Sequence, residues 1–304
     1  MPVPERGKLR GDLLRLVDPS HIGGVAVPEA VPPSHAPTWE IELGAYGTGY
    51  GDIRVDGFEA RNTNHSSNQD AFAVSANRKR FAVTDGLGGA TDNEGTRFLS
   101  KYVADTAVRY DADLFFDDAA LTEMYAEAEK EFTHEFGRPF RVPRFRSKMA
   151  GTVATTLTRG EILARDAAAK KTLMRLTIVG DSPAYRLNSD GEVLEQYGED
   201  AQSGKTDSPI AYKLGIDMQG KPMIPRRETS VGGLHVVDQR IEVADDEFLV
   251  LGSDYFSDIT HALGRFGQLR DFIGLSPEEF HERTKSIGKP DDATLIAILP
   301  KHLA

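Results

Sequence analysis

The chain has 304 residues, of which 39% are hydrophobic and 27% are charged, enough to bury the core of one large domain or two small ones. Its formal net charge of −11 argues against nucleic acid as the main partner, and the absence of cysteine excludes disulfides and thiolate metal sites. Because no apolar run approaches the roughly 20 residues that span a bilayer and no apolar signal core is present, we expect a cytoplasmic protein.

The N-terminal residues 1–45 are predicted to form an arm outside the main fold. Their prolines cluster at Pro28, Pro32, Pro33 and Pro37. Such clustering favours extended, loop-like backbone. We therefore expect one folded domain over residues 46–304.

Short β-rich segments recur along this domain, at residues 70–76, 80–85, 152–160, 173–181, 247–254 and 293–300. Helices are expected over residues 94–110, 121–136 and 276–287, the first because its apolar residues recur at helical spacing. Strands occur in clusters and helices occur in pairs. This order favours antiparallel sheets covered by helices over alternating βαβ units.

Aspartates flank the predicted strands. Three predicted strands end at Asp85, Asp181 and Asp254. Two others begin with an aspartate: one starts at Asp70, and the other starts directly after Asp291 and Asp292. In an antiparallel sheet the end of one strand lies beside the start of its neighbour, so these side chains can meet at one rim. Clustered carboxylates repel one another, and a site built from them usually holds a hard cation such as Mg²⁺ or Mn²⁺. Each aspartate taken alone is equally consistent with a turn.

Glycines follow Asp85 almost at once, at Gly86, Gly88 and Gly89. A tight turn explains them, because glycine adopts positive φ without steric cost. A loop without side chains also leaves room for water and substrate, and its carbonyl oxygens can bind a cation. Both readings are compatible with the sequence.

Six segments resemble, in order, the motifs of the metal-dependent type 2C protein Ser/Thr phosphatases: NQDAFAV, FAVTDGLGGA, AGTVATTL, TIVGDSPAYRL, EFLVLGSDYFSD and KPDDATLIAI. The resemblance implies an α+β fold, an antiparallel β-sandwich flanked by α-helices on both faces. It implies a phosphoprotein phosphatase, opposed to a Ser/Thr kinase, in which two Mg²⁺ or Mn²⁺ ions and a weaker third one serve to activate water. We further expect a monomer that binds neither nucleic acid nor membrane.

The resemblance also assigns roles by position. Asp85, Asp254 and Asp291 would be catalytic and bind metal, and Gly86 would offer its carbonyl oxygen. Asp70 would act through water, and Asp181 would bind the additional metal. His65, or Arg61 nearby, would contact the substrate phosphate.

Several residues depart from the pattern of these phosphatases. Gln69 stands where many members have a metal-binding Glu, His65 where they have Arg, and Tyr255 where they have Gly. Arg146 and Lys148 lie near the expected position of an Asp that would assist Asp181. The departures support an alternative, a catalytically weak or inactive binding or regulatory module, and a phosphoesterase of small molecules is a third reading. Residues 196–228 correspond to a variable flap beside the active site.

Overall fold

The computed structural model describes residues 39–47, 53–62, 68–86, 93–139, 153–198, 214–216, 222–223, 236–256, 277–284 and 292–300. The chain divides into two compact units, Met1–Ser34 and His35–Ala304, and every element described below belongs to the second. Of the predicted arm, residues 1–38 lie outside the described residues, and residues 39–45 belong to strand β1 (Trp39–Gly47). In the described part of the chain, no helix is long and apolar enough to cross a membrane.

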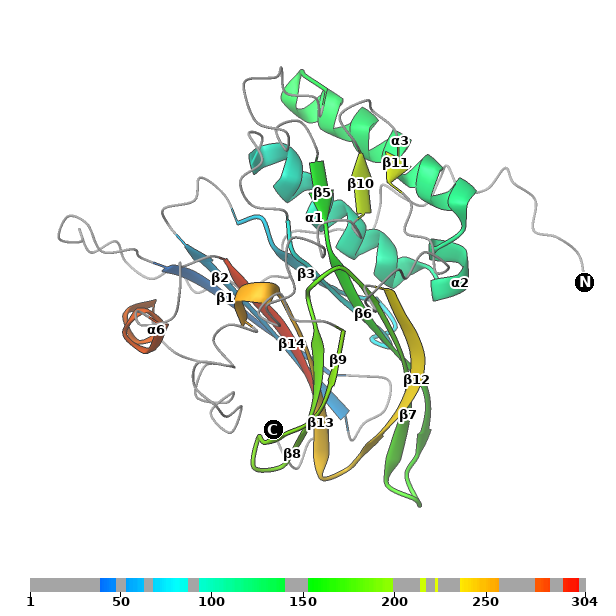
Figure 1. Cartoon of the computed structure of the whole chain (residues 1–304), viewed down its shortest axis with the longest axis vertical. Helices are drawn as coiled ribbons and strands as arrows, with labels where there is room; N and C mark the ends of the chain where they lie inside the picture. The colour runs from blue at the N-terminus through cyan, green and yellow to red at the C-terminus, as the bar shows by residue number, and fades with distance from the viewer. Residues whose placement is uncertain are drawn as a thin grey trace, which may run out of the picture. The chain divides into compact units, whose positions relative to one another are not determined.

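Antiparallel strands form two large sheets and one small sheet (Figure 1). The first large sheet has the order β1, β2 (Ile53–Asn62), β14 (Ala293–Pro300), β13 (Glu247–Gly252), β8 (Ala184–Asn188) and β9 (Val193–Tyr197). The second has the order β12 (Val236–Ala244), β7 (Lys171–Val179), β6 (Leu157–Asp166), β4 (Arg80–Thr84) and β3 (Ala71–Val74). The small sheet has the order β11 (Pro222–Met223), β10 (Leu214–Ile216) and β5 (Val153–Thr155).

The two large sheets pack face to face around a common apolar core. Phe81 and Val83 of β4 contribute to it from one sheet, and Leu251 of β13 and Ile296 of β14 contribute from the other. Ala82, between the two β4 core residues, faces the helices instead. This alternation is the expected result of successive strand side chains pointing to opposite faces. The predicted β-sandwich is confirmed.

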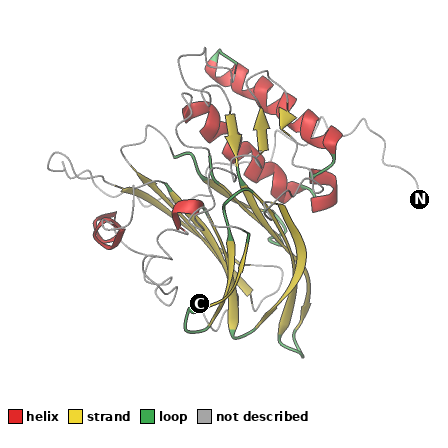
Figure 2. Cartoon of the chain, in the orientation of Figure 1, coloured by secondary structure: helices red, strands yellow, loops and turns green. Residues whose placement is uncertain are grey.

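Helices cover the sandwich on both sides (Figure 2). α1 (Asn93–Arg109), α2 (Ala112–Phe115) and α3 (Asp118–Phe136) pack on the second sheet through the apolar cluster that includes Leu99 and Phe132. α6 (Pro277–Thr284) contacts β1 of the first sheet. The α+β class with helices on both faces is therefore confirmed.

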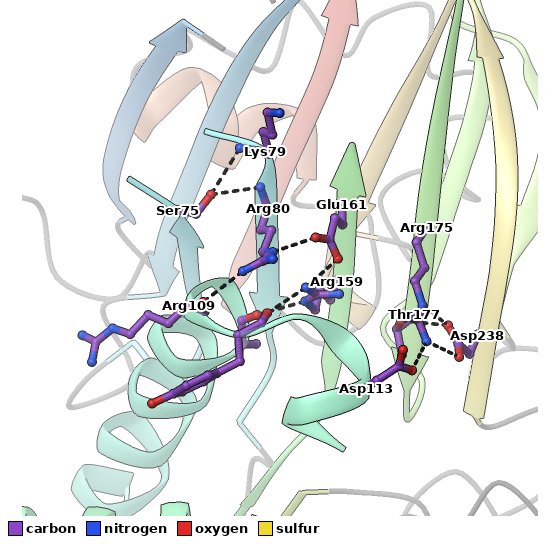
Figure 3. A network of polar contacts seen from close by, with 12 residues as sticks. Ser75, Lys79, Arg80, Arg109, Asp113, Arg159, Glu161, Arg175, Thr177 and Asp238 are labelled. Atoms are coloured by element: carbon purple, nitrogen blue, oxygen red, sulfur yellow. Dashed lines mark hydrogen bonds and ion pairs between the residues drawn. The ribbon is translucent and has the colours of Figure 1, made fainter. Parts of the chain in front are cut away.

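A buried arginine network ties the C-terminal end of α1 to the second sheet (Figure 3). Arg159 of β6 is fully buried and donates at 2.9 Å to the carbonyl oxygens of Ala107 and Tyr110. Arg80 of β4 donates to a third carbonyl oxygen there at 2.9 Å, and Glu161 accepts from both arginines. The guanidinium groups thus satisfy carbonyl oxygens that the last turn of a helix leaves without intrahelical partners.

We expect Arg159→Ala to lower the free energy of unfolding by about 3 to 5 kcal/mol, because it removes the donor to two carbonyl oxygens and one of the two cations that pair with Glu161. Chemical denaturation measures this change. Lys171→Ala is the control, since it breaks an exposed pair of similar length, 2.8 Å to Glu242, and should leave the denaturation midpoint unchanged. Equal midpoint shifts in the two variants would contradict the assignment of a stabilising role to the buried network.

Candidate metal centre

The strand registers bring the predicted aspartates toward one another. β3 pairs with β4 so that Ala71 faces Thr84, and Asp70 and Asp85, the next residues outward, are therefore neighbours. Asp254 comes two residues after the end of β13 and Asp181 two residues after the end of β7. The strand-end argument from the sequence thus accounts for the meeting of four carboxylates.

Asp85 is the centre of this group. The backbone N–H of Asp254 donates to Asp85 Oδ2 at 3.1 Å, across 169 residues of sequence. Burial raises the pKa of the Asp85 carboxyl well above its usual range, and the nearby carboxylates of Asp254, Asp70 and Asp181 raise the pKa further. Each added negative charge makes ionisation of Asp85 less favourable, so a bound cation would relieve an existing repulsion.

Two threonines at the junction of β5 and β6 fix the backbone of Asp85. The backbone N–H of Thr156 donates to the Asp85 carbonyl oxygen at 2.8 Å, and Thr155 Oγ1 donates to the same oxygen at 2.9 Å. Gly86 forms an isolated antiparallel bridge with Thr155. Both threonines belong to the motif AGTVATTL, from which no role for them was predicted. The sequence feature that could have indicated this role is the run of hydroxyl residues within an apolar strand.

Gly86 is buried in a space that excludes a side chain. A Cβ atom built there would lie 2.5 Å from Cγ2 of Thr96 and 2.6 Å from the carbonyl oxygen of Gln69. It would also lie 2.9 Å from Oγ of Ser100. Since real Cβ atoms do not approach other atoms this closely, glycine is required at this position by packing.

The segment before β3 is held by Asp292, one of the aspartates predicted to flank the strands. Asp292 is 2% exposed, and its Oδ2 accepts a hydrogen bond at 2.9 Å from the backbone N–H of Gln69. The Oε1 atom of Gln69 is buried and has no hydrogen-bond partner in the described part of the chain. A buried acceptor of this kind is suited to a cation or to a water molecule.

Some of the predicted site residues cannot be located. His65, Asp291, Arg146 and Lys148 lie outside the described residues. Arg61 lies in β2 opposite Glu40 of β1, and its side chain is not described.

The third departure, Tyr255, follows Asp254 directly. Its side chain is 1% exposed and is therefore part of the interior.

The donor set fits a hard cation. The groups that converge are carboxylates, and oxygen ligands are those that Mg²⁺ and Mn²⁺ prefer. Within the described residues, no three His, Asp or Glu side chains form a ready-made ligand set. Asp291, the remaining candidate ligand, is not among those residues.

Part of the predicted flap is attached directly to this centre. Within residues 196–228, strand β10 pairs with β5 so that Leu214 faces Thr155, the residue that bonds to Asp85. The buried phenol of Tyr125 on α3 accepts from the backbone N–H of Gly215 at 2.9 Å and donates to the carbonyl oxygen of Met223 at 3.2 Å. One side chain of α3 therefore holds both described flap strands.

Neither a protein-family model nor a curated protein matches the sequence. Solved structures similar to this chain include the serine/threonine phosphatase PstP/Ppp of Mycobacterium tuberculosis, with 18% identity, a TM-score of 0.45, and coverage of 82% of this chain and 99% of that one. A phosphatase from Toxoplasma gondii has 12% identity, a TM-score of 0.47, and coverage of 86% and 96%. PppA, a key regulatory component of T6SS in Pseudomonas aeruginosa, has 13% identity, a TM-score of 0.43, and coverage of 86% and 98%. The serine/threonine phosphatase of S. agalactiae is a further solved structure similar to this chain.

Proposed function

We propose that this chain is a phosphatase that depends on Mg²⁺ or Mn²⁺ and acts on phosphorylated Ser or Thr residues of proteins. The observation that carries the proposal is the convergence of Asp70, Asp181 and Asp254 on the carboxylate of Asp85. Four carboxylates from separate strand ends raise the free energy of the metal-free fold. Binding of divalent cations would offset this repulsion and would give the four carboxylates a function as ligands.

In the proposed site, Asp85 and Asp254 hold the cations together with Asp291 and the carbonyl oxygen of Gly86. Asp70 orients a water, and Asp181 serves an additional, weaker position. When bound, the cations would supply an activated water and neutralise charge on the phosphate during in-line attack. His65 or Arg61 would bind the phosphate. The extent of the catalytic domain, residues 46–304, the monomeric state, the kinase partner and the cytoplasmic location also stay predictions.

Hydrolysis of p-nitrophenyl phosphate tests the proposal. We expect turnover with Mn²⁺ or Mg²⁺ and none with EDTA, because without a cation no group in the proposed site would activate water or neutralise the negative charge of the phosphate. The expected turnover should return when Mn²⁺ is added back in excess over the chelator. Absence of turnover from folded protein with either metal would contradict the proposal.

A second candidate function is a binding or regulatory module that retains the fold without efficient catalysis. Gln69 favours it, because a neutral amide stands where the resemblance expects a glutamate. Folded protein that binds Mn²⁺ yet hydrolyses no phosphate ester would support this second function.

Comparing the hydrolysis of two phosphate esters distinguishes a phosphoprotein phosphatase from a phosphoesterase of small molecules. A phosphoprotein phosphatase should hydrolyse a phosphothreonine peptide with a higher kcat/KM than p-nitrophenyl phosphate under the same metal concentration. The opposite preference would favour a phosphoesterase of small molecules.

A further inference from the structure

Two buried hydroxyl groups lie between the loop that carries Asp85 and the loop that carries Asp181. Thr156 is 2% exposed and Ser182 is 0% exposed. β6 is the strand between β4 and β7, and Thr156 immediately precedes it. Thr156 therefore has the end of β4 on one side and the end of β7 on the other.

The hydroxyl of Thr156 contacts both loops. Its Oγ1 accepts from the backbone N–H of Asp85 at 3.1 Å. The same oxygen lies 2.6 Å from Oγ of Ser182, the residue that follows Asp181, and either hydroxyl can be the donor. Ser182 is held in turn, because its carbonyl oxygen accepts from the hydroxyl of Thr158 on β6.

We propose that Thr156 and Ser182 are positioning residues whose hydroxyl bridge sets the spacing between the carboxylates of Asp85 and Asp181. The inference rests on the proposed function, since the spacing matters through the affinity for a divalent cation. The two carboxylates repel each other, and the repulsion tends to move their loops apart. A short, buried bridge anchored on both strand ends opposes this movement and keeps the oxygen ligands of the proposed cation positions close together.

If the hydroxyls of Thr156 and Ser182 had only a structural role, removing them would have a different effect. Buried hydroxyls commonly serve only to satisfy neighbouring polar groups, and removing one then lowers stability wherever it lies. Thr177 of β7 provides the comparison, because it is also buried and its Oγ1 donates at 3.3 Å to Asp238, which also accepts from Arg175 (Figure 3). Its hydroxyl contacts neither aspartate loop.

Isothermal titration of Mn²⁺ into the metal-free full chain tests the bridge without relying on activity. We expect Thr156→Val and Ser182→Ala each to weaken Mn²⁺ binding about tenfold, and Thr156→Ser to restore the affinity to within about threefold of wild type. Thr177→Val should bind Mn²⁺ like wild type. The double variant Thr156→Val/Ser182→Ala should bind no more weakly than either single variant, because the two substitutions break one bridge.

Thermal unfolding in EDTA accompanies each titration and shows whether the variants fold. Wild-type affinity in folded Thr156→Val, or losses that multiply in the double variant, would overturn the bridge while leaving the proposed function intact. Wild-type protein that binds no Mn²⁺ would overturn the proposed function and the bridge with it. Equal loss of affinity in Thr177→Val would show a general effect of stability and would also overturn the bridge.

Discussion

Replacement of Asp85 by Asn is expected to lower metal-dependent hydrolysis by at least about a hundredfold. The substitution removes the negative charge at the centre of the carboxylate group and keeps the shape of the side chain. Even residues that only support metal ligands change affinity or activity by about 10- to 100-fold when they are replaced. Hydrolysis of p-nitrophenyl phosphate over a range of Mn²⁺ concentrations measures the loss.

The same substitution is expected to stabilise the metal-free protein. The pKa of Asp85 is raised in the folded state, so the folded protein binds this proton more tightly than the unfolded chain does. Stability in EDTA should therefore fall as the pH rises from about 4, the ordinary carboxyl value, through the raised pKa. Asp85→Asn removes this contribution, and we expect a thermal midpoint at neutral pH about 2 to 4 °C above wild type, equivalent to about 1 kcal/mol.

Asp246→Asn is the control for the change in net charge. Asp246 is exposed in the turn between β12 and β13 and lies outside the group that acts on Asp85. This variant should retain wild-type activity and an unchanged thermal midpoint. An Asp85→Asn protein that is less stable than wild type in EDTA would show that Asp85 supports the fold rather than strains it.

Replacement of Gly86 by Ala is expected to destabilise the protein by about 1 to 3 kcal/mol, the usual effect of overpacking. The new methyl group would meet Thr96 Cγ2 at 2.5 Å and the Gln69 carbonyl oxygen at 2.6 Å. Because a backbone atom cannot rotate away, the segment that leads to Asp70 must move. Mn²⁺ affinity and the denaturation midpoint should therefore both fall.

Gly160→Ala is the matched control for this substitution. A Cβ atom at Gly160 would lie at ordinary contact distance, 3.6 Å from both Leu251 and Met174. Since alanine also restricts the unfolded chain, we expect unchanged or slightly higher stability and wild-type Mn²⁺ affinity. Equal midpoints for Gly86→Ala and Gly160→Ala would contradict the packing argument.

The aspartate cluster could be predicted because strand ends and starts must meet in an antiparallel sheet. The register of β3 and β4 brings Asp70 beside Asp85 by this rule alone. The bonds that hold the cluster could not be predicted in the same way. Residues 152–160 were predicted as one strand, whereas the chain leaves β5 and enters β6 at Thr156.

Two further features had no clear signal in the sequence. Arg159 lies in an apolar strand and is fully buried, although arginine is usually exposed; the carbonyl oxygens at the end of α1 and the carboxylate of Glu161 explain its position. β12, over Val236–Ala244, was missed because three consecutive polar residues, Asp238 to Arg240, interrupt the alternation of apolar and polar positions that indicates a strand. Its pairing with β7 along nine residues stabilises it.

The contacts of the candidate centre join segments that are far apart along the chain. Asp254 bonds to Asp85 across 169 residues, and Gln69 bonds to Asp292 across 223. β14 also inserts between β2 and β13, so the first sheet cannot close before distant segments have met. Contacts of such long sequence separation slow folding and form late. A cation bound there would consequently slow unfolding more than it would accelerate folding, and the proposed metal would act chiefly on the lifetime of the native state.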